Sequence, residues 1–418
     1  MAASEPSPRI ALCLIVRNGA ETLERCLESA RPFVDEVDVY DTGSTDGTLA
    51  LLERLNANGK GPPIRVERGS WRDDFAWARE QSFSLASPGV EWLLWLDADD
   101  ELVGGDQLHS LVASATKLDA FAVYYDCERD AFGQPIEQVW RLRLVRRSTG
   151  YVWQGQVHEG LVAPAGSRPR VQAVDRRRVR VIHHSTDETD PRRNLRILLR
   201  LEERAREGGD KLEPGLFLSL CLELVGLGEF EQAVPRLRRY LAEFDPKWTD
   251  ERVHASAQLA ACLRLLGELP EAIKIERQAA SARPDWIEPG LGLAASYAAL
   301  ERWDEAEQWA AETTRLALPS SPLLLDPRWL TLGPPLRLVE ARLAGGRKDA
   351  REAVEKARLR ATLDPWLLAT LGLIEASIAK GDSERGLQLV RTALGRYDPQ
   401  LRAIAAGLRF SEPRSDGG

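Results

Sequence analysis

The run Trp92-Leu-Leu-Trp-Leu-Asp97-Ala-Asp99-Asp100-Glu101 joins an apolar segment to a stretch in which four of five residues are acidic. In an open α/β sheet, ligands bind outside the carboxyl ends of the strands. Carboxylates crowded there raise one another's pKa unless a cation is present, and divalent metals such as Mg²⁺ prefer hard oxygen ligands. The alternative is a solvated helix N-terminus, where the helix dipole favours acidic side chains. The apolar strand in front of the acidic residues favours the metal site.

The segments around this run alternate between strand-like and helix-like patterns. Short β-branched or aromatic runs are separated by stretches with apolar residues at helical spacing. This alternation is typical of βαβ units and a mainly parallel sheet. From residue 120 to about 184 strands dominate, which predicts a mixed sheet added to the first four strands. The predicted strands are 10–16, 36–41, 64–68, 91–96, 121–125, 139–146, 151–153, 157–162 and 179–183, and the predicted helices are 21–30, 47–56 and 74–85.

Beyond Pro191 the strand pattern ends, and helices separated by turns repeat. The runs Leu227-Gly-Glu-Phe-Glu-Gln-Ala233, Leu266-Gly-Glu-Leu-Pro-Glu-Ala272 and Leu300-Glu-Arg-Trp-Asp-Glu-Ala306 end in alanines 39 and 34 residues apart. A period near 34 with a small residue after an inter-helix turn resembles tetratricopeptide repeats. Weaker echoes at 346–350 and 381–386 extend the array to about five units. We predict an α/β domain over 1–190, an all-α repeat domain over 191–410 and a disordered tail over 411–418.

The composition excludes several classes of protein. The 56 basic and 64 acidic residues give a net charge of −8, which argues against sequence-independent nucleic-acid binding. No apolar run approaches the roughly 20 residues that span a bilayer. The first apolar stretch, 10–16, has no cleavage-site pattern after it, so we interpret it as a core strand and not a signal peptide. Five widely spaced cysteines exclude a C-x-x-C metal site or a disulfide framework and are typical of a reducing cytoplasm.

A second polar cluster, Asp41-Thr-Gly-Ser-Thr-Asp46-Gly47, follows the predicted strand 36–41. Asp46 or Thr45 suits the N-cap of the next helix. Asp41 lies at the strand end, where a carboxylate can accept hydrogen bonds from a nucleobase N–H or a ribose hydroxyl. We therefore interpret Asp46 as a cap and Asp41 as a ligand contact.

Taken in order, these motifs resemble the family-2 glycosyltransferases with the GT-A fold. The matching runs are Ile10-Ala-Leu-Cys-Leu-Ile-Val16-Arg17-Asn18, Asp41-Thr-Gly-Ser-Thr-Asp46, Asp74-Phe-Ala-Trp-Ala-Arg79 and Trp95-Leu-Asp97-Ala98-Asp99. Their order and spacing match over about residues 9–105, and weaker matches continue to about residue 190. The resemblance implies a nucleotide-sugar-binding α/β domain that inverts the anomeric configuration by direct displacement. With helical repeats attached, the architecture is similar to that of bacterial peptide S- or O-glycosyltransferases.

The resemblance also implies a role for each matching residue. Val16 and Arg17 would flank the base pocket, and Asp41 would bind the base or ribose. Asp97 would lie near the ribose, and Asp99 would ligate Mg²⁺ or Mn²⁺. Arg79 would approach the phosphates, for which the planar fork of an arginine is suited; the alternative for this residue is a surface ion pair. The implied donor-binding residues are Val16, Arg17, Asp41, Arg79, Asp97 and Ala98.

Two histidine motifs follow in the strand-rich region. A histidine at a strand end, in a chain that already carries Asp-x-Asp, is a plausible third metal ligand. Relatives often have a histidine at the place of His183, so we choose His183 over His184, which remains the alternative. Imidazole suits Mn²⁺ better than Mg²⁺.

Displacement at an anomeric carbon needs a general base that takes the acceptor proton. Glu159 is our first candidate because it lies in a Gly-flanked loop and matches a His-Glu pair common in this branch, with His158 orienting it or the substrate. Asp100 and Glu101 compete for the role because they lie near the metal. Their alternative role is helix capping.

The sequence thus predicts a cytoplasmic, inverting, metal-dependent glycosyltransferase. A UDP-hexose is the expected donor, and a peptide, protein or small glycan is the expected acceptor. The repeats offer a concave surface for the acceptor or for a homodimer. One alternative is a helical-repeat adaptor with a degenerate catalytic domain. Another is a nucleotidyltransferase, but that would need a Gly-rich basic loop, which Val16-Arg17-Asn18-Gly19 matches poorly.

Overall fold

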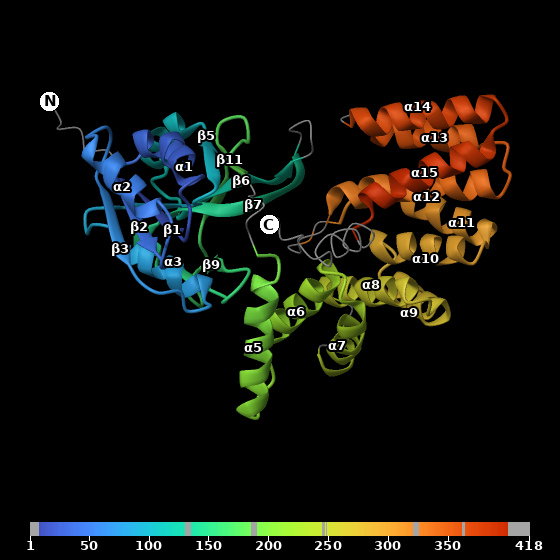
Figure 1. The fold of residues 1–418 in the computed structure, drawn as a ribbon, viewed down its shortest axis with the longest axis horizontal. Coiled ribbons are helices and arrows are strands. Elements are labelled where there is room, and N and C mark those ends of the chain that lie inside the picture. Colours follow the sequence, from blue (N-terminus) through green and yellow to red (C-terminus); the bar gives the residue numbers. More distant parts are fainter. Residues whose placement is uncertain are drawn as a thin grey trace, which may run out of the picture. The chain divides into compact units, whose positions relative to one another are not determined.

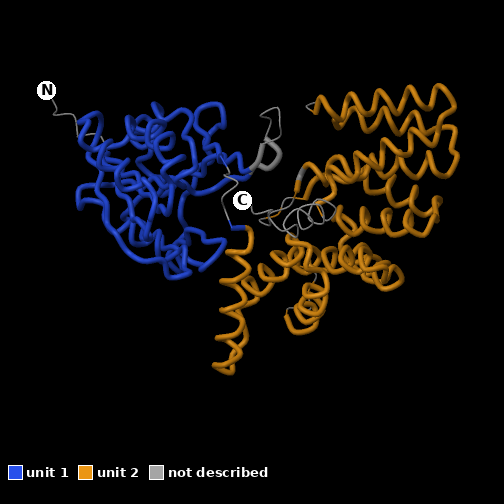
Figure 2. Tube along the Cα trace, in the orientation of Figure 1, with its two compact units in different colours: residues 1–190 blue, residues 191–418 orange. Residues whose placement is uncertain are grey.

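The computed structural model of the protein describes residues 8–129, 135–184, 190–244, 247, 249–319, 321, 326–361 and 364–399. The chain divides into two compact units, residues 1–190 and residues 191–418, which Figure 2 shows in different colours. The tail predicted at 411–418 lies outside the described residues.

The first unit is built around a nine-stranded sheet (Figure 1). Its order is β3-β2-β1-β4-β7-β6-β11-β5, and β10 pairs with β6. Five strand pairings are parallel and three are antiparallel, so the predicted mixed, mainly parallel sheet is confirmed. Its strands are β1 (Ile10–Val16), β2 (Glu36–Asp41), β3 (Ile64–Arg68), β4 (Trp92–Asp97), β5 (Asp100–Val103), β6 (Ala120–Arg129), β7 (Pro135–Arg146), β10 (Val171–Ala173) and β11 (Arg180–His183). The unit also contains a small hairpin of β8 (Val152–Gln154) and β9 (Gly160–Val162), the helices α1 (Leu23–Ala30), α2 (Thr48–Ala57), α3 (Phe75–Ser84) and α4 (Leu108–Ser114), and the 3-10 turns η1 (Arg31–Phe33), η2 (Gly105–Gln107) and η3 (Arg147–Thr149).

Strand β1 lies at the point where the strand order reverses. It pairs in parallel with β2 on one side and with β4 on the other. In the register of these pairs, Val16 lies opposite Asp41 and Ile15 lies opposite Asp97. The carboxyl ends of three adjacent strands therefore meet at one edge of the sheet, the place where open α/β sheets bind ligands.

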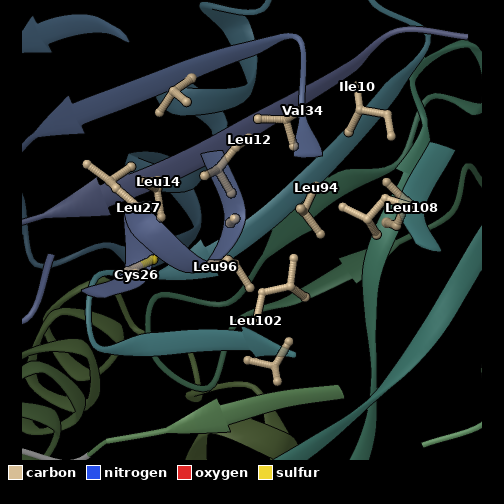
Figure 3. Close-up of a cluster of buried hydrophobic side chains, with 14 of the residues drawn as sticks. Ile10, Leu12, Leu14, Cys26, Leu27, Val34, Leu94, Leu96, Leu102 and Leu108 are labelled. Atoms are coloured by element: carbon tan, nitrogen blue, oxygen red, sulfur yellow. The ribbon is translucent and has the colours of Figure 1, made fainter. Parts of the chain in front are cut away.

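Alternation along β1 sends its side chains to two different hydrophobic layers. Ile10, Leu12 and Leu14 belong to the cluster under α1, α2 and α4, part of which Figure 3 shows. Ala11 and Cys13 belong to a second cluster, which α3 and the β8–β9 hairpin cover. Because both faces of the sheet are covered, strand β1 is apolar at every position, as expected for a buried parallel strand.

Two short strands, β5 and β10, were not predicted from the sequence. Strand β5 begins inside the acidic run, so the chain turns back into the sheet after Asp99 and does not start a helix there. It pairs antiparallel with β11, which places His183 opposite Asp100. The helix-capping alternative for the acidic run is therefore wrong. Strands β6 and β7 are longer than predicted and form a ribbon in the centre of the sheet order.

The second unit consists of helices in its described part, which confirms the predicted all-α repeat region. Helix α5 is followed by five helical hairpins, in which each helix packs on its neighbour. The helices are α5 (Arg193–Glu207), α6 (Pro214–Gly226), α7 (Phe230–Glu243), α8 (Asp250–Leu265), α9 (Leu269–Ala282), α10 (Ile287–Ala299), α11 (Trp303–Thr314), α12 (Pro327–Ala344), α13 (Ala350–Arg360), α14 (Pro365–Ala379) and α15 (Ser383–Tyr397).

The turn inside each hairpin has the same backbone conformation. One residue adopts a positive φ, and the N–H of the residue after it bonds to the carbonyl five positions earlier, as Glu229 does to Leu224 at 2.8 Å. This is the Schellman arrangement that ends helices. The small residues predicted to allow close helix packing, Ala233, Ala272 and Ala306, are at most 1% exposed. The residues with positive φ are Gly228, Gly267, Glu301, Gly346 and Gly381.

Glu301 is the only one of these five turn residues that carries a side chain, and its φ is +56°. The left-handed conformation costs a residue with a Cβ atom about 1–2 kcal/mol, and glycine avoids this. Glycine, however, gives the unfolded chain more conformational freedom, which lowers the free energy of unfolding by about 0.4–1 kcal/mol. We therefore expect Glu301→Gly to raise the free energy of unfolding by about 0.5–1 kcal/mol. Urea denaturation followed by circular dichroism measures this, and a destabilised variant would contradict it.

The five cysteines all lie among the described residues and are free thiols. Cys13, Cys26, Cys221 and Cys262 are buried, and Cys127 is partly buried. Among the described residues, no helix has both the length and the apolar character that a membrane crossing requires.

Candidate active site

The acidic run forms a turn at the edge where β1, β2 and β4 end. Asp97 is the last residue of β4 and Asp100 is the first residue of β5. The main-chain N–H of Asp97 donates to Oδ2 of Asp100 at 2.9 Å, which closes the turn. Because β11 pairs with β5, His183 reaches the same corner from the other end of the domain sequence.

Three side chains at this corner could hold one metal ion. Asp99, Asp100 and His183 each offer a ligand atom, and these atoms all lie within 4.8 Å of one another. Nδ1 of His183 is 3.5 Å from Oδ1 of Asp99 and 3.3 Å from Oδ1 of Asp100. Two carboxylates and one imidazole form a donor set that suits Mn²⁺. The set suits Mg²⁺ less well, because imidazole is a better ligand for Mn²⁺ than for Mg²⁺. The structure thus brings the predicted ligands Asp99 and His183 together and adds Asp100.

The electrostatics of the corner fit a site for a cation. The pKa of Asp99 is raised to about 6, because burial and the charges of Asp97 and Asp100 outweigh the opposing effect of His183. Burial lowers the pKa of His183, but its hydrogen bond to Asp100 and the charges of Asp99 and Asp100 outweigh this and raise it. Carboxylates that repel one another in a partly buried site are what a divalent cation relieves.

Asp100 is fully buried, in contrast to Asp99, whose side chain is 27% exposed. Its Oδ2 also lies 3.1 Å from Nη1 of Arg143. An acceptor cannot reach a fully buried carboxylate, so the expectation that Asp100 faces the acceptor does not fit its position. Glu159 and Glu101 remain as carboxylates with access to solvent.

Arg79 joins two of the predicted site residues. It lies on α3, is 5% exposed and donates from Nη2 to Asp97 at 2.6 Å and from Nε to Glu159 at 2.6 Å. Its guanidinium also stacks on the rings of Trp95 and Trp153, at 4.4 and 5.1 Å from the ring centres. Arg79 is therefore a buried ion-pair bridge, and the predicted alternative of a surface ion pair does not describe it.

This bridge fixes the charge of Asp97. Burial alone would raise the pKa of Asp97, but the guanidinium groups of Arg79 and Arg143 outweigh burial and hold that pKa well below its usual range. Asp97 is therefore ionised at neutral pH. Its side chain is 28% exposed, so a ligand at the sheet edge can still reach it.

Glu159 follows a tight loop that packs on α3. Gly155 has φ +99°, and a Cβ atom there would lie 3.1 Å from the carbonyl oxygen of Val157. His158 also has a positive φ, +53°, a conformation that is uncommon outside functional sites and turns. The carbonyl of Gln156 accepts from the N–H of Phe75 at 3.0 Å, which ties the loop to the start of α3. Glu159 is thus placed by the backbone and by Arg79.

Asp41 is fully buried, and its side chain holds a turn. Its Oδ1 accepts from the N–H groups of Gly43 and Ser44, both at 3.1 Å. The predicted contact of Asp41 with the base or ribose would require these bonds to be shared or broken. The N-cap of α2 is Gly47, so the predicted N-cap at Asp46 or Thr45 is wrong, although the carboxylate of Asp46 accepts from the N–H of Thr48, the first residue of α2, at 3.0 Å.

The loops after β1 and β2 are bonded to each other. The N–H of Asn18 donates to Ser44 at 2.9 Å, and Oδ1 of Asn18 accepts from the N–H of Thr45 at 2.8 Å. Asn18 makes both bonds from a left-handed conformation, with φ +54°. The two loops therefore form one connected rim beside the acidic turn.

The predicted donor residues at the end of β1 differ in exposure. Val16 is buried and Arg17 is exposed. A Cβ atom at Gly19 would lie 2.7 Å from Cγ2 of Val16 and 3.5 Å from Cβ of Ala98. Val16 and Ala98 therefore come together across Gly19, and only a glycine fits between them.

The cation and the aromatic rings on the inner side of the acidic turn were not predicted from the sequence. Arg143 of β7 is fully buried, and its guanidinium lies 3.7 Å from the ring centre of Trp95 and 4.3 Å from that of Tyr125. A sequence cue exists, because a charged residue two positions from Val145 in an apolar strand falls on the buried face of a sheet. The sequence pattern predicted Arg143 only as a residue of the strand 139–146.

The segment that carries this edge of the sheet is similar to known proteins. Residues 11–160 match the family described as Glycosyl transferase family 2. The SPbeta prophage-derived glycosyltransferase SunS of Bacillus subtilis is 24% identical over 274 residues, which cover 62% of this chain and 59% of SunS. The lipopolysaccharide core biosynthesis glycosyltransferase LpsC of Rhizobium meliloti is 31% identical over 168 residues, which cover 39% of this chain and 60% of LpsC.

A third relative is named for its repeats. A TPR repeat-containing protein of Synechococcus elongatus is 42% identical over 95 residues, which cover 23% of this chain and 21% of that protein. The chain therefore matches between about a fifth and three fifths of the length of the three relatives. The family match rests on one segment: residues 11–160 of this chain are similar to glycosyl transferase family 2.

Proposed function

We propose that the protein is an inverting, metal-dependent glycosyltransferase that takes a sugar from a nucleotide-diphosphate sugar, with a UDP-hexose as the expected donor. The observation that carries the proposal is the corner formed by Asp97, Asp99, Asp100 and His183 at the carboxyl ends of β4 and β11. It lies in a domain that matches a glycosyltransferase family. The relatives SunS and LpsC, both named as glycosyltransferases, support the same activity.

Asp99, Asp100 and His183 would hold Mg²⁺ or Mn²⁺, which neutralises the departing diphosphate. Asp97 stays ionised through Arg79 and accepts hydrogen bonds from the ribose side of the donor. We place the donor against the rim formed by the loops after β1 and β2, where Arg17 is exposed and Val16 and Ala98 close the wall. For Arg79 we propose an indirect role, because it is buried and its Nε and Nη2 already donate to Glu159 and Asp97.

Glu159 is our proposed general base. Arg79 occupies only Oε1, and among the described residues no hydrogen-bond donor pairs with Oε2. A carboxylate held in this way keeps one oxygen to take the acceptor proton while the other fixes its orientation. Asp100 is too deeply buried for this role, so Glu101 is the remaining competitor. Its Oε2 lies 2.7 Å from Nε2 of His184.

The helical unit is the proposed acceptor-binding part of this cytoplasmic enzyme. Repeat arrays present extended surfaces to partners, which suits a peptide, protein or glycan acceptor, and the same surface could form a homodimer. LpsC is named for lipopolysaccharide core biosynthesis, so we keep a glycan as an alternative acceptor to a peptide. A non-catalytic adaptor is the second candidate, but it would not need a charged turn that keeps Asp97, Asp99 and His183 together.

Release of the nucleoside diphosphate tests the function directly. The full chain would be incubated with UDP- and GDP-sugars in the presence of Mn²⁺ or Mg²⁺, and free UDP or GDP would be measured with and without candidate acceptors. Slow hydrolysis that an acceptor accelerates is the expected result, and NMR of the product shows whether the anomeric configuration inverts. Absence of turnover with every sugar, together with capture of a partner by the helical unit, would favour the adaptor.

A further inference from the structure

Arg143 is a buried cation behind the acidic turn. It lies on β7 with no exposed surface, between the rings of Trp95 and Tyr125. Burying a guanidinium costs free energy unless a partner of opposite charge compensates for the lost water. The burial of Arg143 must therefore be compensated by its partners, which indicate its role.

The principal partner of Arg143 is Asp100. Nη1 of Arg143 lies 3.1 Å from Oδ2 of Asp100, and this same oxygen accepts the N–H of Asp97 at 2.9 Å. Nη1 also lies 3.5 Å from the carbonyl oxygen of Trp95 and 3.9 Å from Oδ2 of Asp97. One carboxylate oxygen thus connects the buried cation to the main chain that carries Asp97 and Asp99.

A second arginine on the same strand, Arg146, connects chain segments through its hydrogen bonds and serves as a comparison. Arg146 lies over the ring of Trp92 at 4.5 Å and donates from Nε to Leu118 at 3.0 Å and from Nη2 to Ala115 at 2.6 Å, both main-chain carbonyls. Among the described residues, the same two nitrogens of Arg143 are buried without a hydrogen-bond partner. Arg143 therefore contributes its charge to Asp100 and does not tie chain segments together through its other donors.

We infer that Arg143 is a positioning residue, which fixes the turn from Asp97 to Asp100 for cation binding by holding the buried carboxylate of Asp100. Without this cation, Asp100 would be an uncompensated charge in the interior, and the turn would lose its closing acceptor. Asp99 and Asp100 would then no longer face His183 together. The inference rests on the metal site of the proposed function, but it does not depend on which sugar or acceptor is used.

Arg143 could instead weaken cation binding through its positive charge. The two roles predict opposite changes in metal affinity when Arg143 is removed. A positive charge near a divalent cation repels it, so an arginine that acted only through Coulomb repulsion would weaken metal binding, and its removal would strengthen it. Positioning predicts weaker binding when Arg143 is removed. The direction of the change in affinity therefore separates the two roles.

Calorimetric titration of the full chain with Mn²⁺, without nucleotide, measures that direction. Arg143→Met keeps the length of the side chain and removes its charge, whereas Arg143→Lys keeps the charge. Loss of a group that orients metal ligands weakens metal binding by about 10–100-fold, which we expect for Arg143→Met, and we expect Arg143→Lys to stay within about 3-fold of the wild type. Arg146→Met is the matched control, because it should lower thermal stability and leave the Mn²⁺ affinity unchanged.

Each outcome supports or overturns the inference. Unchanged or tighter Mn²⁺ binding in a folded Arg143→Met variant overturns it, as does a wild-type chain that binds no Mn²⁺. Should Arg143→Met fail to fold, Arg143→Lys decides, because a loss of 10-fold or more with the charge retained also overturns it. Weaker binding in Arg143→Met, in a chain that shows no turnover with any nucleotide sugar, would uphold the inference and remove the proposed function instead.

Discussion

Asp99→Ala is expected to abolish metal-dependent sugar transfer while the fold survives. Asp99 offers a ligand atom at the cation site, and its side chain is partly open to solvent. Stabilisation of transition-state charge by a metal amounts to several kcal/mol, so loss of the ion lowers turnover by about 10³-fold. Donor affinity should fall as well, because a cation held by Asp99, Asp100 and His183 would supply positive charge for the diphosphate. Nucleoside diphosphate release and calorimetry with Mn²⁺ measure both effects.

The fold should tolerate this change because the side chain of Asp99 is 27% exposed and does not lie in a hydrophobic core. Burial raises its pKa to about 6, well above the value near 4 of an unfolded chain. The folded, metal-free state therefore holds the proton more tightly, and the charged side chain lowers stability as the pH rises above about 4. At pH 8 without metal, Asp99→Ala should unfold at a temperature no lower than that of the wild type.

Asp106→Ala is a suitable control, because Asp106 is an exposed acidic residue in η2, outside the corner. It should leave turnover and Mn²⁺ affinity unchanged. Undiminished turnover in Asp99→Ala, together with no effect of EDTA on the wild type, would remove the metal mechanism.

Glu159→Gln should lower kcat strongly and leave donor affinity near that of the wild type. Removal of a general base typically costs about 10²–10⁴ in rate. Glutamine keeps an oxygen that can accept from Nε of Arg79, so the bridge to Asp97 should persist. A general base would face the acceptor and not the diphosphate, so the dissociation constant of UDP should not change. Measurement of kcat and of UDP binding separates these effects.

The matched variant is Glu101→Gln, at the other candidate carboxylate. If Glu159→Gln keeps a normal kcat and Glu101→Gln loses it, the role of base passes to Glu101. Loss of UDP affinity in Glu159→Gln would make Glu159 a structural residue that orients Arg79. Glu159→Ala is less informative, because it also removes the acceptor for the Arg79 bond.

Much of the fold was predictable because the strongest patterns lie in the best-buried elements. Strand β1 is apolar at every position, and α3 begins one residue after Asp74, which accepts from the N–H of Trp77 as an N-cap. The repeat turns were predictable because four of the five left-handed positions are glycine. Strands β5 and β10 have four and three residues, too few for a period, and their partners lie far away in the sequence.

The sequence predicted only those site residues that belong to local motifs. Asp97 and Asp99 stand out because acidic residues follow an apolar strand, and His183 because it ends one. The pairing of β5 with β11 is a long-range contact, so the sequence could not show that Asp100 turns inward while Asp99 stays accessible. The ion pairs of Arg79 and Arg143 depend on the same tertiary packing, so the sequence could not show which carboxylates they pair with.

The shielded thiols described above make the chain well suited to site-specific labelling. The reactive species of a cysteine is its thiolate, and burial raises the pKa of Cys221 and Cys262 to about 12 and the pKa of Cys13 and Cys26 well above the usual range. A maleimide dye should therefore react much faster with a cysteine introduced on the surface than with these four native ones. One dye on each unit would then report, by energy transfer, the distance between them as donor and acceptor bind.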